Sequence, residues 1–130
     1  MSAPRPRPIS SARAPAAVGP YSQAIRAGGF VFVSGQIGVD PAAGALVAGG
    51  IGEETRRALL NVEGILGSAG LHLADVVKTT VYLIDIEEWP DMNVVYAEFF
   101  PANPPARAAV AVRALPKGAR VEIEAVAAER

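Results

Sequence analysis

The amino-acid sequence predicts an α+β fold in which a mixed β-sheet carries two helices on one face. The chain has 130 residues, 51% of them hydrophobic and 19% charged, which suits one globular domain with a single core. Two runs of helical period each lie between runs of strand-like alternation. Helices in such positions usually connect neighbouring parallel strands, and we therefore expect both on the same side of the sheet.

Residues 1–13 are expected to form a flexible leader that precedes a domain at residues 14–130. Their proline content disfavours a helix, and no apolar segment typical of a secretory signal is present. Arg5, Arg7 and Arg13 make the leader basic, and no acidic residue balances them. A role in localisation is the alternative to a plain tail.

A β-hairpin is expected around Gly28-Gly29, because tight turns between antiparallel strands require positive φ angles. The strand that follows has apolar side chains on both faces, which indicates a central strand covered on both sides. Its two faces carry Phe30, Phe32 and Ser34 on one side and Val31 and Val33 on the other.

The middle of the chain changes period. Apolar residues recur every three or four positions between Gly52 and Ala69, which predicts an amphipathic helix. Gly64 and Gly67 within it indicate close packing. The other segments expected here are a turn at 40–44, strands at 46–48 and 75–83, and a second helix from Pro90 to Phe100.

Two alternating runs end the chain, at 107–113 and 121–125, and the turn residues Pro116-Lys117-Gly118 between them indicate that they pair. Lone charges in such strands indicate either a solvated face or a site for a charged ligand. If the strands pair, Arg107 and Glu122 could converge on a ligand, or they could form an ordinary cross-strand ion pair.

The second face of the sheet has no helix to cover it. Nevertheless the strands at 30–35, 76–83 and 107–113 are apolar on both sides. We therefore expect a homo-oligomer in which the sheets of different copies pack against one another.

The composition excludes several kinds of site. Cysteine is absent and His72 is the only histidine, so disulfides, a thiolate nucleophile and an ordinary transition-metal site are excluded. No phosphate-binding loop or dinucleotide fingerprint occurs. The body after the arginine-rich leader is acidic, which argues against nucleic-acid binding, and no apolar run could span a membrane. We expect a cytoplasmic protein that needs neither a cofactor nor a metal.

Few side chains remain that could carry chemistry. The guanidinium of Arg107 is a planar fork that suits a carboxylate. The carboxylate of Glu122 could act as a general base toward a bound water. The other candidates are Tyr21, Ser34, Lys78, Asn93 and Glu124.

Several motifs, in the same order along the chain, resemble the RidA family (also called YjgF or L-PSP) of reactive-intermediate imine deaminases. They cover nearly everything after residue 13. The C-terminal motifs are Pro105-Ala106-Arg107, Leu115-Pro116-Lys117-Gly118 and Val121-Glu122-Ile123-Glu124-Ala125. The earlier ones lie at residues 14–24, 33–37, 61–62, 77–81 and 93–100.

The resemblance implies a chorismate-mutase-like fold and a homotrimer whose sheets form a central barrel, with one site in the cleft of each subunit. It implies hydrolysis of 2-imino acids, such as 2-iminopropanoate and 2-iminobutanoate, and of their enamine tautomers to 2-keto acids and ammonia. By the family pattern, Arg107 holds the substrate carboxylate and Glu122 orients or activates the water. Tyr21, Ser34, the backbone of Gly35 and Asn93 are expected to line the site.

The chain departs from the family pattern at Ala109, where the best-known members carry cysteine. Hydrolysis by water needs no thiol, so we expect activity that is insensitive to thiol reagents. The smaller side chain leaves more room in the cleft, which leaves the substrate preference open. Two alternatives stand beside the deaminase: a regulatory module that binds small carboxylic acids without turnover, and an endoribonuclease or translation inhibitor.

Overall fold

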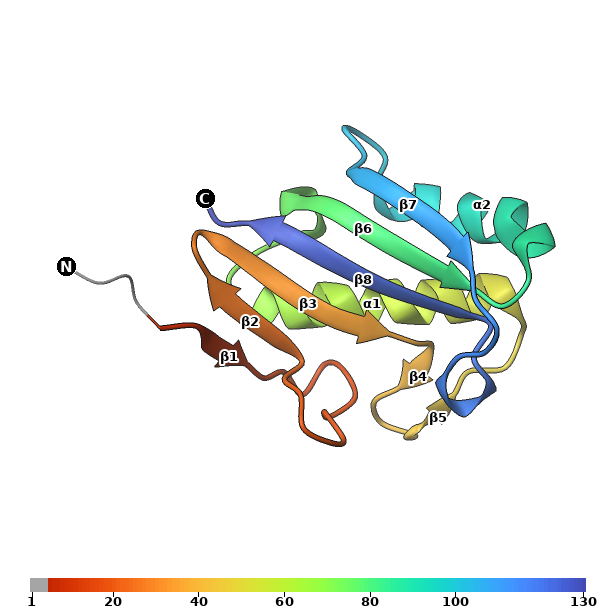
Figure 1. Cartoon of the computed structure of the whole chain (residues 1–130), viewed down its shortest axis with the longest axis horizontal. Helices are drawn as coiled ribbons and strands as arrows, with labels where there is room; N and C mark the ends of the chain where they lie inside the picture. Colours follow the sequence, from red (N-terminus) through yellow and green to blue (C-terminus); the bar gives the residue numbers. More distant parts are fainter. Residues whose placement is uncertain (1–4) are drawn as a thin grey trace.

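The computed structural model describes residues 5–130, and its centre is a six-stranded sheet with the order β1-β2-β3-β8-β6-β7 (Figure 1). Neighbouring strands are antiparallel except β6 and β7, which are parallel. The elements are β1 (Arg7–Ile9), β2 (Ala24–Ala27), β3 (Phe30–Gln36), β4 (Val39–Asp40), β5 (Ala45–Leu46), α1 (Ile51–Ser68), β6 (Val76–Leu83), α2 (Trp89–Phe99), β7 (Ala106–Ala111) and β8 (Val121–Ala128).

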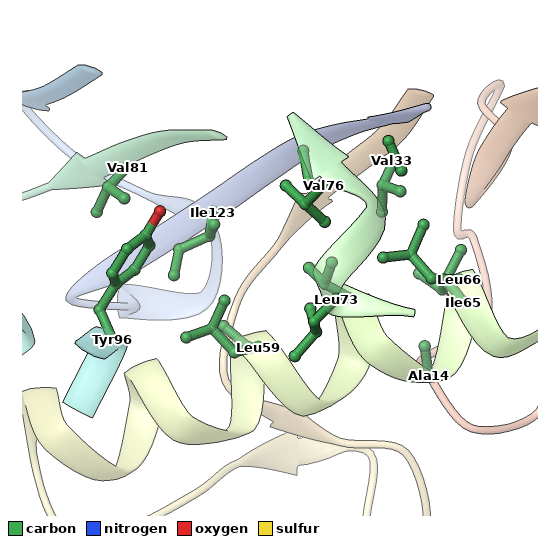
Figure 2. Close-up of a cluster of buried hydrophobic side chains, with 14 of the residues drawn as sticks. Ala14, Val33, Leu59, Ile65, Leu66, Leu73, Val76, Val81, Tyr96 and Ile123 are labelled. Carbon is green, nitrogen blue, oxygen red and sulfur yellow. The ribbon is translucent and has the colours of Figure 1, made fainter. Parts of the chain in front are cut away.

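The core lies between the sheet and the two helices, as the α+β prediction requires (Figure 2). Val33 of β3 and Ile123 of β8 are buried against α1, whose Leu59, Ile65 and Leu66 are fully buried. Every second residue of β8 from Val121 onward is buried in this way. The residues between them therefore lie on the other, helix-free face of the sheet.

Most elements form where the hydrophobic pattern predicts them. The helices expected at 52–69 and 90–100 are α1 and α2, and the strand expected at 75–83 is β6. Gly28 and Gly29 have φ angles of 60° and 84° and form the turn between β2 and β3. Gly64 marks close packing as predicted, because a Cβ there would lie 2.7 Å from the Cβ of Arg13.

The leader differs from the flexible tail that its prolines predict. Residues 1–4 lie outside the described part of the chain, but Arg7–Ile9 forms β1 and pairs with β2. β1 is an edge strand, where Pro8 is tolerated because its missing N–H is not needed for pairing. Ile9 is buried in the core, and the Ser11 hydroxyl donates a hydrogen bond to the Gly64 carbonyl.

The predicted pairing of the last two strands is wrong. β7 and β8 both pair with β6, which lies between them. The reason is the connection through α2, which returns the chain parallel to β6 and places β7 at the edge of the sheet. β8 then occupies the central position between β6 and β3 (Figure 1).

The helix-free face combines exposed apolar side chains with charged ones. Phe30, Phe32 and Val110 are 41%, 46% and 43% exposed in the single chain. The assembly of several copies that would cover them stays a prediction. Neither of the α-helices in the described part of the chain is long and apolar enough to cross a bilayer.

Candidate active site

Arg107 lies on the edge strand β7, and its side chain is held against α2 on the helix-covered face. Its Nη1 donates a 2.7 Å hydrogen bond to Oδ1 of Asn93, the helix residue expected beside it. Its Cζ lies 4.6 Å from the ring centroid of Tyr96 and 5.5 Å from that of Trp89. The bond to Asn93 uses one of the five N–H donors of the guanidinium, so other donors are available to a ligand.

A hollow of about 400 Å³ opens beside this guanidinium, between α2 and the loop that leads into β7. Its lining is mainly apolar or aromatic, with Arg107 as its charged group. Such a hollow fits a small anion with a short apolar tail. The lining residues are Asn93, Tyr96, Ala97, Phe100, Pro104, Pro105 and Arg107.

Glu122 lies on β8 and lines a second hollow of about 540 Å³ on the helix-free face. Tyr21, Gly35 and Lys117 line the same hollow, so within one chain Tyr21 and Gly35 lie beside Glu122 and not in the hollow of Arg107. Burial of the side chain, and secondarily the charge of Glu124, raise the pKa of the Glu122 carboxyl. A carboxylate with a raised pKa is a stronger base than one in water.

Gly35 provides the space that the Glu122 carboxylate occupies. A Cβ added to Gly35 would overlap the Glu122 carboxylate. The neighbouring Ser34 is placed differently from the expectation, because it lines neither hollow. Its hydroxyl donates a 2.6 Å hydrogen bond to the Ser22 carbonyl and so holds the chain next to Tyr21.

Arg107 and Glu122 do not converge within one chain, which corrects the sequence-based expectation. Arg107 is paired with Thr79 of β6, and Glu122 with Tyr82 of the same strand. Positions 79 and 82 are three residues apart, so their side chains point to opposite faces of the sheet. The alternative of a cross-strand ion pair is excluded by the same geometry.

Several side chains of the two hollows were not singled out from the sequence. Trp89 and Tyr96 form the aromatic surroundings of Arg107, and Lys117 lines the Glu122 hollow with a left-handed φ of 59°. Tyr96 lies in the helix expected at 90–100, but no sequence signal connects it with Arg107. Ala109 lines neither hollow and packs against the core. Lys78 and His72 are exposed.

Comparison with known proteins agrees with the resemblance found in the sequence. The model of the family described as Endoribonuclease L-PSP matches residues 11–129. The chain belongs to this family. A 2-iminobutanoate/2-iminopropanoate deaminase from Homo sapiens is 54% identical over 93% of this chain and 88% of its own.

Solved structures of similar proteins have the same fold. The crystal structure of TdcF from E. coli with bound serine is 40% identical and superposes with a TM-score of 0.91, over 95% of this chain and 99% of that one. RidA from an Antarctic Psychrobacter species is 42% identical with a TM-score of 0.90, over 94% and 98%. The predicted RidA resemblance is therefore confirmed.

Proposed function

We propose that this protein hydrolyses 2-imino acids, such as 2-iminobutanoate and 2-iminopropanoate, to 2-keto acids and ammonia. The observation that carries the proposal is the guanidinium of Arg107. Asn93 holds this group by one hydrogen bond, and its other N–H donors can bind a ligand in the small, largely apolar hollow beside it. A guanidinium binds a carboxylate through two parallel hydrogen bonds. The identity to a deaminase of that name supports the choice of substrate.

We further propose a chorismate-mutase-like homotrimer in which the Arg107 hollow of one copy faces the Glu122 hollow of the next. Arg107 is on the edge strand and Glu122 on the helix-free face, so neither hollow holds both groups. Neighbours in a ring meet through two different surfaces, which is the contact that a divided site needs. Packing of the sheets would also bury the exposed Phe30 and Phe32.

In this site the protonated imine is attacked by water. Glu122 takes a proton from the water while the water oxygen bonds to the imine carbon, which gives a carbinolamine. The carboxyl returns this proton to the nitrogen, the C–N bond breaks as the C=O bond forms, and the departing ammonia takes up the hydroxyl proton. A positioned base increases the rate by about 10²–10⁴-fold. Holding the substrate and the water together increases the rate further.

The test is the rate of ammonia release when threonine dehydratase supplies the imine in the same solution. We expect the protein to accelerate the release, and Arg107→Ala to abolish the acceleration while the oligomer persists in light scattering. Unchanged ammonia release with the wild-type protein would contradict the proposal.

A binding module without turnover is the second candidate, favoured by the serine bound to TdcF from E. coli. Calorimetric binding of 2-ketobutanoate without any ammonia release would support it. The family description also names an endoribonuclease. RNA cleavage that survives stringent purification and disappears in Glu122→Gln would support that activity instead.

A further inference from the structure

Thr79 and Tyr96 meet directly behind Arg107. Thr79 is the register partner of Arg107 in the parallel β6–β7 pair, so both side chains lie on the helix-covered face. Tyr96 reaches both of them from α2. Its hydroxyl shares a 2.7 Å hydrogen bond with Oγ1 of Thr79, and its ring centroid is 4.6 Å from Cζ of Arg107. Figure 2 shows the hydroxyl of Tyr96 pointing from α2 toward the sheet.

The Tyr96 ring has little freedom to move. Thr79 is 1% and Tyr96 5% exposed, and the ring of Phe100 lies 4.8 Å from that of Tyr96. Swinging the side chain away from Thr79 would leave two buried hydroxyls without a partner, which is unfavourable. The hydrogen bond therefore fixes the position of the ring, and its burial beside Phe100 restricts rotation of the ring plane.

Arg107 has a long side chain that loses conformational freedom when it grips a ligand. Asn93 holds its guanidinium through Nη1, and its Cζ lies over the Tyr96 ring. These two contacts with α2 restrict the motion of the group. A guanidinium that is already restricted in this way loses less entropy on binding.

We propose that the Thr79–Tyr96 hydrogen bond positions Arg107 for the substrate carboxylate. Thr79 and Tyr96 are thus positioning residues that act through the guanidinium. This inference depends on the proposed role of Arg107 as the group that holds the carboxylate. It adds residues to the site that the sequence motifs did not assign to it.

The protein contains its own reporter for the test. Trp89 is the only tryptophan in the chain, and its ring lies 5.5 Å from Cζ of Arg107. Binding of 2-ketobutanoate at Arg107 is expected to change the Trp89 fluorescence, and Arg107→Ala to remove this change. The titration gives a dissociation constant without requiring turnover.

Thr79→Val and Thr79→Ser form a matched pair, since valine keeps the shape of threonine and serine keeps its hydroxyl. We expect Thr79→Val to raise the dissociation constant roughly three- to tenfold, the range of one hydrogen bond. Thr79→Ser should stay within about twofold of the wild type, because its hydroxyl can still pair with Tyr96. A folded Thr79→Val protein with wild-type affinity would overturn the proposal, as would a Thr79→Ser protein as weak as Thr79→Val.

Tyr96→Phe supplies an independent variant that keeps the ring and loses the same hydrogen bond. It should weaken binding as Thr79→Val does, and the double variant should be little weaker than either, because both changes remove one interaction. Fully additive losses would contradict the proposal.

The experiment separates this inference from the proposed enzyme. Arg107-dependent binding without ammonia release would refute the enzyme, and the dissociation constants would still decide the role of Thr79 and Tyr96. Absence of Arg107-dependent binding in the wild-type protein would overturn both.

Discussion

The two hollows differ in how their charged group is held. Arg107 is fixed by a hydrogen bond to Asn93 and by the ring of Tyr96. Glu122 accepts no hydrogen bond within residues 5–130, and its carboxylate fits only because position 35 is glycine. A group that grips a ligand gains from a fixed orientation. A group that moves a proton instead needs a free lone pair and a suitable pKa.

The largest effect is expected from Glu122→Gln, which keeps the shape of the side chain and removes its basicity. We expect kcat to fall by about 10²–10⁴-fold. Because Arg107 is the group proposed to hold the carboxylate, the affinity for 2-ketobutanoate should change little. The measurements are ammonia release and the Trp89 titration.

Glu124→Gln is the matched control, since Glu124 lies on the same face of β8 and is hydrogen-bonded to the Tyr82 hydroxyl. Its kcat near neutral pH should stay close to that of the wild type. Equal losses in the two variants would remove the distinction between Glu122 and its neighbour.

Gly35→Ala tests whether free space is what the carboxylate of Glu122 requires. The added methyl group would displace that carboxylate, and a misplaced catalytic group can cost up to about 10²-fold in rate. Gly52→Ala is the control, because its Cβ would make only an ordinary 3.5 Å contact with Val95. Equal ammonia-release rates in the two variants would show that position 35 needs no glycine.

The smallest effect is expected in the pH dependence of kcat, when Glu124 is replaced by glutamine. Burial and Glu124 raise the pKa of Glu122, so the base form, and with it kcat, should be lost as pH falls through a value above that of a free glutamate. Glu124→Gln removes the like charge and should move this acid limb to lower pH. Tyr82, Lys117 and Tyr21 also face Glu122 and are unchanged in this variant. An acid limb that stays in place would show that Glu124 has no influence on Glu122.

The raised pKa also links Glu122 to stability. A carboxyl that is harder to ionise in the folded chain favours folding at low pH, and this contribution is lost as pH rises through its folded pKa. In Glu122→Gln this pH dependence should disappear from the thermal unfolding midpoint. A dependence that persists in the variant would assign it to another group.

The sequence predicted which residues share a face of each strand, but not which strands are neighbours. The alternation holds in both strands, since Arg107 shares a face of β7 with Ala109, and Glu122 shares a face of β8 with Glu124. Their relation depends on β6, which lies between the two strands. The turn residues Pro116-Lys117-Gly118 after β7 are typical of a hairpin, and only the tertiary packing of α2 shows that this connection passes the end of β6.

The sequence pattern also could not predict that part of the leader is ordered and packs on the domain. Ile9 is a single apolar residue among prolines and arginines, so it produces no periodic signal. Its burial depends on the pairing of β1 with β2 and on the core against which Ile9 packs, and both form only in the folded domain. The same holds for Tyr96, whose contact with Arg107 joins α2 to β7.

The most direct test of the divided site is to mix two inactive variants. Arg107→Ala and Glu122→Gln chains are refolded together, and ammonia release is compared with that of each variant refolded alone. If each site takes Arg107 from one copy and Glu122 from its neighbour, about a quarter of the sites in a random mixture regain both groups, and activity returns. Mixed oligomers as inactive as the single variants would contradict the account.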